Sequence, residues 1–476
     1  MKIARATPFE GKPVIHMPSV YGGCTGKGMI VRIPVTGLRP ITIQVEGLPE
    51  GLEFSEGIIR GKVMREGGFP VKITAGNALG KACKEVTFRI GEDTMLLTPM
   101  LGFTSWNAYG WTVTQKNMED TAAAMLASGI ADYGYQYINI DSSWQKEYGG
   151  KYDAVMPNEK FPDMKGFCDR MHAKGLKCGI YSTPMLTAWG CPEELESIPG
   201  CTRGEPDIYF TCNNGGVGKE HLEENNVKQW DEWGFDYLKY DWAPCEPINA
   251  DYMKKALLKA SREIAYSVTV DADFGYREYW KRYCNSFRCN RDSIDQWHNV
   301  KQYLNLQSDC RIERWKDAVS PGHFYDLDML EIGPMTHWNG GRTRLTENEA
   351  IFAYTLRAFF LSPIQLSCVV EQMTEFERDM VCNEEVIAVN QDSLADYPDF
   401  YSADEKEELV IYKRKLENGD ALFAVFNTAE EEKTAVLDLE GYCAVRELWT
   451  RQEKEWKKDF ACKVEPHCAI LLRALK

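Results

Sequence analysis

Aspartates follow several apolar segments in the middle of this sequence. Asp141 ends residues 137–141 and Asp241 ends residues 237–241, and later segments are followed by Asp271, Asp273, Asp292, Asp326 and Asp328. Aromatic and basic side chains accompany them, at Trp106, Trp144, Tyr181, Lys239, Trp242 and Arg288. Two carboxyl groups that flank one acetal bond supply the acid, base or nucleophile that cleaves it, and flat aromatic faces pack against the C–H face of a sugar. These residue types therefore indicate chemistry on a glycosidic bond.

The segments that carry these residues read as parallel strands alternating with helices. Eight apolar runs predict the strands, at residues 102–106, 137–141, 178–181, 237–241, 268–271, 286–288, 328–332 and 364–367. Amphipathic patterns predict a helix over residues 117–128 and another that starts at Thr346 and continues through Phe360. This alternation predicts an α/β fold, a (β/α)8 TIM barrel, in which polar residues at the C-terminal strand ends meet in one active site.

Short alternating strands separated by Gly and Pro turns flank the barrel on both sides. We predict an immunoglobulin-like β-sandwich over residues 1–93, the catalytic barrel over residues 94–395 and a C-terminal antiparallel β-sandwich over residues 396–476.

Composition excludes several classes of partner. A net charge of -16, from 55 basic and 71 acidic side chains, repels a nucleic acid backbone. No apolar run is long enough to cross a bilayer, so we expect no membrane partner. The first residues lack the apolar core of a secretory signal, so we expect a cytoplasmic protein; the alternative is a secreted or periplasmic one whose signal has been removed. The sequence leaves homo-oligomerisation open.

Histidines and cysteines show no ligand spacing. The seven histidines lie far apart and the sixteen cysteines form no C-x-x-C pair, so we expect no metal and no other cofactor. Most cysteines are expected to be buried thiols. The disulfide state of four expected loop cysteines stays open: Cys191, Cys201, Cys212 and Cys245.

The motifs in combination resemble glycoside hydrolase family 27, the α-galactosidase and α-N-acetylgalactosaminidase family. They are residues 99–107, 137–141, 237–241, 284–288 with Asp292, and 326–333. The resemblance covers residues 98–476 and does not account for the first 93. It implies a retaining exo-α-glycosidase that acts on a small carbohydrate or glycan, with terminal α-galactosides as the first substrate class.

The resemblance also implies a role for each matched residue. Asp241 would be the nucleophile that forms a covalent glycosyl-enzyme, and Asp292 the general acid/base. Lys239, on the same strand face as Asp241, would bind sugar hydroxyls and keep Asp241 ionised. The other expected substrate contacts are Trp106 as a wall of the sugar pocket, Asp141 and Tyr181 on hydroxyls, Arg288 near the 2-hydroxyl, Asp328 beside Arg288, and Asp273, rather than Asp271, on the 2-substituent.

One departure from the family pattern bears on the sugar. The family's α-galactosidases usually carry two adjacent aspartates after the second strand, but here Asp141 is followed by Ser142. A neutral hydroxyl reaches less far and bonds more weakly than a carboxylate. A β-L-arabinopyranosidase, or another α-glycoside hydrolase of the same family, is therefore the alternative enzyme. The alternative from another class is a non-catalytic carbohydrate-binding protein.

Overall fold

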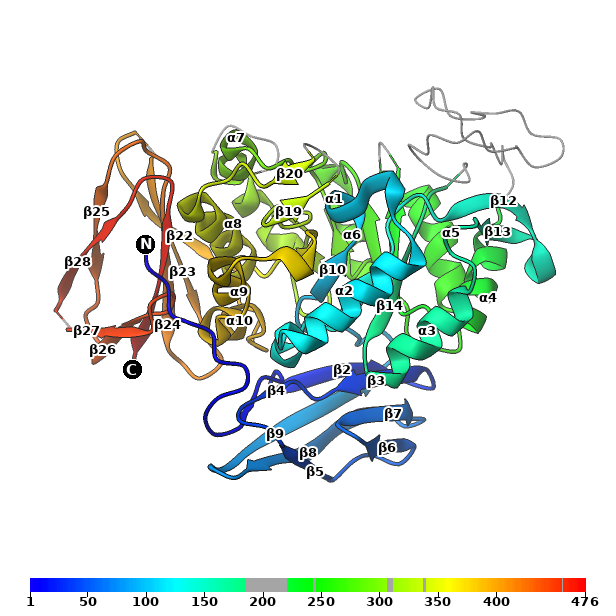
Figure 1. The fold of residues 1–476 in the computed structure, drawn as a ribbon. Helices are drawn as coiled ribbons and strands as arrows, with labels where there is room; N and C mark the ends of the chain where they lie inside the picture. The colour runs from blue at the N-terminus through cyan, green and yellow to red at the C-terminus, as the bar shows by residue number, and fades with distance from the viewer. Residues whose placement is uncertain (185–220, 243–244, 306–310, 337–339, 407, 456) are drawn as a thin grey trace.

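A parallel sheet closed into a barrel forms the centre of the protein (Figure 1). The computed structural model describes residues 1–184, 221–242, 245–305, 311–336, 340–406, 408–455 and 457–476. In the sheet the strand order is β18-β17-β16-β15-β14-β11-β10-β21. The strands are β10 (Leu101–Thr104), β11 (Tyr137–Asn139), β14 (Lys177–Ser182), β15 (Tyr237–Asp241), β16 (Ala265–Thr269), β17 (Ser286–Phe287), β18 (Phe324–Tyr325) and β21 (Ile364–Leu366).

The barrel closes at the segment that follows β18. Leu330 forms a parallel bridge with Leu366, and its N–H donates to the Gln365 carbonyl over 2.8 Å. Seven of the eight expected strands lie where the apolar runs predict them. The seventh prediction, residues 328–332, is wrong, because the paired strand is Phe324–Tyr325. The apolar side chains of residues 327–332 are buried without forming a ladder, and burial alone cannot tell such a segment from a strand.

Helices lie around the barrel and at one of its ends (Figure 1). They are α1 (Trp106–Tyr109), α2 (Gln115–Ala127), α3 (Met164–Ala173), α4 (Glu223–Trp233), α5 (Pro247–Leu257), α6 (Arg277–Tyr283), α7 (Trp297–Lys301), α8 (Glu347–Phe359), α9 (Glu375–Val381) and α10 (Glu384–Asn390). The 3-10 turns are η1 (Gly110–Thr112), η2 (Ile130–Tyr133), η3 (Gly150–Tyr152), η4 (Phe274–Tyr276), η5 (Gln302–Leu304), η6 (Ile312–Ala318) and η7 (Val370–Gln372). Thr346 and Glu349 form a reciprocal capping box at the start of α8, which confirms the predicted start.

The N-terminal region is rich in strands and has a core of its own. Its strands are β1 (Val14–Ile15), β2 (Val20–Cys24), β3 (Gly28–Arg32), β4 (Val35–Thr36), β5 (Thr42–Glu46), β6 (Leu52–Ser55), β7 (Ile58–Lys62), β8 (Gly67–Asn77) and β9 (Gly80–Gly91). A four-stranded sheet, β2-β9-β8-β5, and a three-stranded sheet, β3-β7-β6, share one apolar cluster. In Figure 1 these sheets lie beneath the barrel, on the side opposite to α1.

The C-terminal region is an antiparallel sandwich, as predicted. Its strands are β22 (Asp399–Ala403), β23 (Leu409–Lys415), β24 (Ala421–Asn427), β25 (Lys433–Asp438), β26 (Ala444–Glu447), β27 (Gln452–Lys454), β28 (Asp459–Val464) and β29 (Ala469–Leu475). Helix α8 is buried between this region and the barrel, where Phe352 packs edge-on against Phe426 with ring centres 5.1 Å apart. One apolar cluster therefore runs through both parts.

Two short hairpins stand on the barrel face that also carries α1. They are β12 (Gln145–Gly149) with β13 (Ala154–Pro157), and β19 (Pro334–Met335) with β20 (Gly341–Arg342). No helix in the described part of the chain combines the length and the apolar character that a bilayer-spanning helix needs.

Candidate active site

Lys239 and Asp141 form an ion pair at the C-terminal ends of two barrel strands. The Lys239 Nζ lies 2.8 Å from the Asp141 Oδ2, and the other carboxylate oxygen accepts the Ser142 N–H over 2.8 Å. The Asp141 N–H donates to the Ser105 hydroxyl over 3.0 Å, which fixes the end of β11 against the β10 loop. Burial disfavours the charge on Lys239, but the charges of Asp141 and Asp241 outweigh it and raise the pKa of the ammonium. Lys239 is therefore a cation held among carboxylates.

Arg288 joins two further carboxylates of the predicted site. One terminal nitrogen of its buried guanidinium donates to the Asp292 Oδ1 over 2.6 Å, and the other pairs with the Asp328 Oδ1 at 2.7 Å. The second oxygen of Asp328 accepts the Ser293 N–H over 2.7 Å. The side chain of Asp328 is almost fully buried, whereas that of Asp292 is 51% exposed. The buried Asp328 thus fixes Arg288, and Arg288 in turn holds the exposed Asp292.

Asp241 lies between these two cations. Burial raises the pKa of Asp241 to about 7, even though the charges of Lys239 and Arg288 favour its ionised form; the negative charges of Asp292 and Asp141 raise the pKa further. A carboxyl that titrates near neutral pH because of burial and specific charges is typical of a functional group.

The Tyr181 hydroxyl points into the same group of charges. It is buried beside Asp241, and within the described residues its contact with that carboxylate is not a well-formed hydrogen bond. Its pKa is raised well above the ordinary value, first by burial and then by the charges of Asp241, Asp141 and Asp292. A buried hydroxyl whose hydrogen bonding is incomplete is costly, so this hydroxyl is suited to a polar ligand that enters the site.

A second polar group lies beneath these residues. Asp326 accepts the N–H of Asp328 over 2.8 Å and the side-chain amide of Gln365 over 3.0 Å. Burial and the charge of Asp328 raise its pKa to about 6. A small cavity lies here, lined by Tyr237, Lys239, Ser267, Thr269, Arg288, Asp326, Asp328, Met329 and Gln365. Gln365 was not predicted, although a polar residue between Ile364 and Leu366 in a buried strand is a signal for it.

The aromatic and neutral members of the predicted set also lie at this end of the barrel. Trp106 begins α1 directly after β10, and Ser142 is buried beside Asp141. Trp111, five residues after Trp106, keeps 44% of its surface exposed.

Asp273 is not brought into contact with the other candidates in the described structure. It caps η4, where its carboxylate accepts the Gly275 N–H over 2.6 Å, and it is exposed. Asx capping at a loop start explains the position, since Asp favours helix N-caps. Asp271 pairs at 3.6 Å with Arg291.

The expected loop cysteine Cys245 is a free and fully buried thiol, so its assignment to an exposed loop is wrong. Its Sγ donates to the Trp242 carbonyl over 3.3 Å. Cys191, Cys201 and Cys212 lie outside the described residues.

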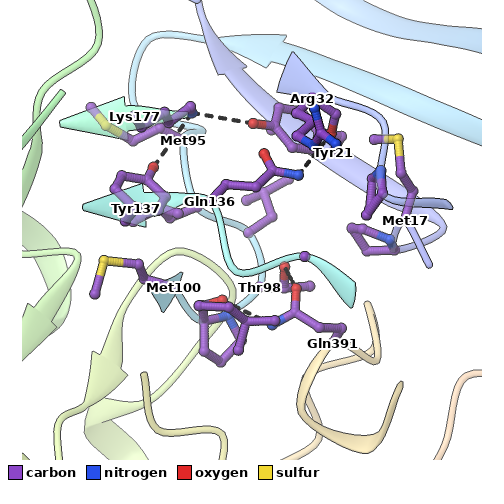
Figure 2. A pocket seen from close by; sticks show the side chains of 18 of the residues that line it. Met17, Tyr21, Arg32, Met95, Thr98, Met100, Gln136, Tyr137, Lys177 and Gln391 are labelled. Carbon is purple, nitrogen blue, oxygen red and sulfur yellow. Dashed lines mark hydrogen bonds between the residues drawn. The ribbon is translucent and has the colours of Figure 1, made fainter. Parts of the chain in front are cut away.

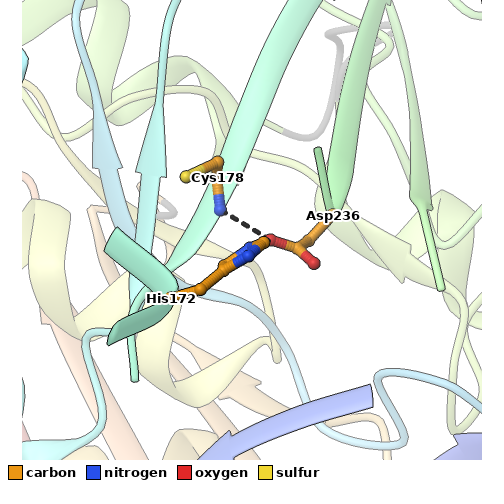
Figure 3. Close-up of side chains that lie close together, drawn as sticks. All are labelled: His172, Cys178 and Asp236. Carbon is orange, nitrogen blue, oxygen red and sulfur yellow. Dashed lines mark hydrogen bonds and ion pairs between the residues drawn. The ribbon is translucent and has the colours of Figure 1, made fainter. Parts of the chain in front are cut away.

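One cluster elsewhere contains residue types that bind metals: His172, Cys178 and Asp236 (Figure 3). Asp236 accepts from His172 over 2.8 Å and from the Cys178 backbone N–H, not from its thiol. The Arg262 guanidinium donates to the second Asp236 oxygen over 2.5 Å. Although burial opposes it, the charges of Arg262 and His172 lower the pKa of Asp236 to about 2. A cation thus already occupies this carboxylate, and the group acts as a buried ion-pair network.

A cavity at the opposite end of the barrel separates the strands from the N-terminal region (Figure 2). There the buried Lys177 donates to the hydroxyls of Tyr21 and Tyr137 over 3.2 and 3.4 Å. The Gln136 amide donates to the Arg32 carbonyl over 2.7 Å. These bonds join the N-terminal region to the barrel on the face away from the carboxylates.

An eightfold barrel with paired carboxylates, cations and a buried tyrosine hydroxyl at its C-terminal face defines the class of a barrel glycoside hydrolase. The chain belongs to the alpha galactosidase A family, whose model matches residues 108–200 and 207–392, more than half of its length. The model of the alpha galactosidase C-terminal beta sandwich domain matches residues 406–474.

Individual relatives agree with this assignment. Alpha-galactosidase A of Cellvibrio japonicus is 31% identical over 355 residues, which span 71% of this chain and 78% of that protein. A Bacteroides fragilis structure, solved as a candidate alpha-galactosidase/melibiase, superimposes with a TM-score of 0.84 at 28% identity and covers 99% of both chains. That likeness therefore includes the first 93 residues. A β-L-arabinopyranosidase of Geobacillus stearothermophilus shares the fold, with a TM-score of 0.68 at 22% identity over 80% of this chain and 96% of that one.

Proposed function

We propose that this protein is a retaining exo-α-glycosidase that removes terminal α-galactosyl residues through a covalent glycosyl-enzyme. The observation that carries the proposal is the buried Tyr181 hydroxyl, which lies beside Asp241, near Asp141 and Asp292, and forms no well-formed hydrogen bond with the described residues. A sugar in this space would meet a nucleophile, an acid and hydroxyl-binding groups at once. The names of relatives such as alpha-galactosidase A support galactose as the first sugar to test.

In the first step Asp241 attacks the anomeric carbon while Asp292 gives its proton to the leaving oxygen. In the second step Asp292, now ionised, takes a proton from water, and the water displaces Asp241. The exposed position of Asp292 suits contact with both the leaving group and water. Arg288 is a positioning residue for Asp292, because it is itself fixed by Asp328.

The hydroxyl-binding set would consist of Asp141, Lys239 and Tyr181, with Trp106 as an apolar wall. Asp141 has both oxygens engaged, by Lys239 and by the Ser142 N–H. Sugar hydroxyls would also bond to Asp141 and would weaken its ion pair with Lys239. The ammonium of Lys239 would then interact more strongly with Asp241. This would lower the pKa of the nucleophile at the moment when its ionised form is needed.

The second candidate function is hydrolysis of β-L-arabinopyranosides, and Ser142 favours it. A pentopyranose lacks the exocyclic hydroxymethyl group and therefore offers one hydroxyl fewer. Because Ser142 replaces the second carboxylate of the family, no buried charge is left unpaired when a pentopyranose binds. Asp273 stays a proposal for the residue that reads the 2-substituent, although it would have to leave its capping position.

A panel of p-nitrophenyl glycosides assayed on the wild type, Asp241→Ala and Asp292→Ala tests the enzyme. Full activity of either variant on the best substrate would contradict the assigned pair. Absence of turnover of every glycoside, with binding of the free sugar retained, would favour the non-catalytic carbohydrate-binding protein. Ser142→Asp tests the sugar separately: the ratio of galactoside to arabinopyranoside kcat/KM should rise, and an unchanged ratio would remove the argument from Ser142.

We also propose the domain division at residues 1–93, 94–395 and 396–476, with an immunoglobulin-like first domain. Two apolar clusters support the first boundary, since one belongs to the N-terminal sheets alone. Lys177 of the barrel donates to the Tyr21 hydroxyl of this domain, and Arg32 of this domain donates to Asp132 of the barrel. These contacts support a bracing role for the domain.

A further inference from the structure

Trp111 differs from the other described tryptophans in its exposure. Six of them are among the largest fully buried side chains of the described residues: Trp144, Trp230, Trp242, Trp280, Trp315 and Trp449. Trp111 keeps 44% of its surface exposed. A single exposed apolar residue is ordinary on a protein surface, so its exposure alone carries no argument. The argument depends on the position of Trp111 and on the contacts that fix its backbone.

Trp111 lies in η1, seven residues after β10, on the barrel face where strand ends carry the carboxylates. Its ring stands edge-on to that of Trp106, with centres 6.2 Å apart and planes at 77°. Two indoles at this angle present their faces in different directions. One flat sugar ring cannot lie against both faces, so each face is suited to a ring of its own.

The backbone of Trp111 is held by two other loops. Its carbonyl accepts from the Ser143 hydroxyl over 3.1 Å and from the Lys160 Nζ over 2.9 Å. Lys160 also donates to the Ser143 hydroxyl over 2.9 Å, and the Asn158 amide donates to the Ser143 carbonyl over 2.9 Å. An exposed indole is thus attached to a fixed backbone. A platform ordered before binding loses little entropy when a ring stacks on it.

We propose that Trp111 is the platform of a leaving-group subsite, which stacks on a ring-bearing aglycone such as a second sugar residue. This rests on the proposed function, in which Trp106 is a wall for the sugar that is cleaved. Trp111 stands next to that wall, and its exposed surface would meet the group on the far side of the scissile bond. Indole faces pack on the C–H face of pyranoses and on aryl rings, so the subsite selects the shape of the aglycone and not its charge.

The test compares two substrates that share the cleaved sugar: a glycosyl fluoride, whose leaving group has no ring, and a disaccharide such as melibiose. The same pair is made with arabinopyranosyl if the wild type prefers that sugar. We expect Trp111→Ala to lower kcat/KM for the disaccharide about tenfold, which corresponds to about 1.4 kcal/mol, and to leave the fluoride within about twofold. Trp111→Phe should recover part of the loss, since it restores an aromatic face.

Phe400→Ala is the matched control, because Phe400 is a similarly exposed aromatic residue in β22 of the C-terminal sheet. It should change neither substrate. Equal losses of Trp111→Ala on both substrates, or no loss on the disaccharide, would overturn the subsite while the glycosidase assignment stands. A wild type that cleaves neither substrate would overturn the proposed function and this subsite with it.

Discussion

Formation of the glycosyl-enzyme should follow the ionisation of Asp241. Burial raises the pKa of this carboxyl to about 7. Roughly 1% of it is then ionised at pH 5 and about half at pH 7, whereas a carboxyl with the ordinary Asp pKa near 4 would be about 90% ionised already at pH 5. The rate of attack is therefore expected to rise about 50-fold between pH 5 and pH 7.

A 2-deoxy-2-fluoroglycosyl fluoride measures this step directly. It traps the glycosyl-enzyme, and fluoride leaves with little help from Asp292, so the second-order rate of inactivation reports the nucleophile alone. Mass spectrometry of the labelled peptide should identify Asp241. A rate that is constant between pH 5 and pH 7 would refute the reasoning, because it would mean that Asp241 is already ionised at pH 5 in the free enzyme.

Lys239→Met extends the experiment. The charge of Lys239 lowers the pKa of Asp241, so its removal should move the rise in rate to higher pH. Lys254→Met is the control, because Lys254 is also a buried lysine in an ion pair, 2.9 Å from Asp93, but lies on α5. Its profile should match that of the wild type. A shift of equal size in both variants would attribute the change to a general loss of structure.

Three further outcomes follow from the same contacts. Asp292→Ala should lower kcat/KM about 1,000-fold on a disaccharide and less than about tenfold on a glycosyl fluoride, which needs no acid; an equal loss on both would argue against an acid/base role. Asp241→Asn should raise the Tm at pH 8 and leave it unchanged at pH 4. The folded wild type keeps a proton on Asp241 that the unfolded chain releases above about pH 4, so the wild-type fold loses stability as the pH rises through 7, whereas the variant does not. A lower Tm of the variant at pH 8 would contradict the raised pKa. Asp236→Asn should destabilise the fold by about 3 kcal/mol in urea unfolding at pH 7, because it leaves the charge of Arg262 without its partner; an unchanged midpoint would show that the network adds nothing.

Local signals predicted most elements of the fold. The capping residue Thr346 predicted the start of α8, and the apolar runs at residues 137–141 and 237–241 predicted β11 and β15. Such signals act over a few residues and therefore survive in any tertiary setting. The seventh strand was missed because its buried apolar run continues beyond the two residues that pair.

The candidate site was predictable in part. Polar residues that end strands of one parallel barrel must share a face, which is why Asp141, Asp241 and Arg288 could be grouped. The partners of each side chain depend on strand order and stagger. The family resemblance, and not the spacing along the chain, predicted Asp328 beside Arg288. The approach of Gln365 to Asp326 was not predicted by either.

The sequence by itself determined the residue types at the strand ends, the alternation of strand and helix, and the presence of Ser142 where a second carboxylate is usual in the family. Tertiary structure alone decided which of these groups are buried together. The packing of the chain buries Asp241 and so raises its pKa, and it also buries Cys245. The same packing leaves Asp273 exposed as a cap and Trp111 exposed. The physical reason is that solvent exposure and charge proximity are sums over residues far apart in the chain, which no local pattern contains.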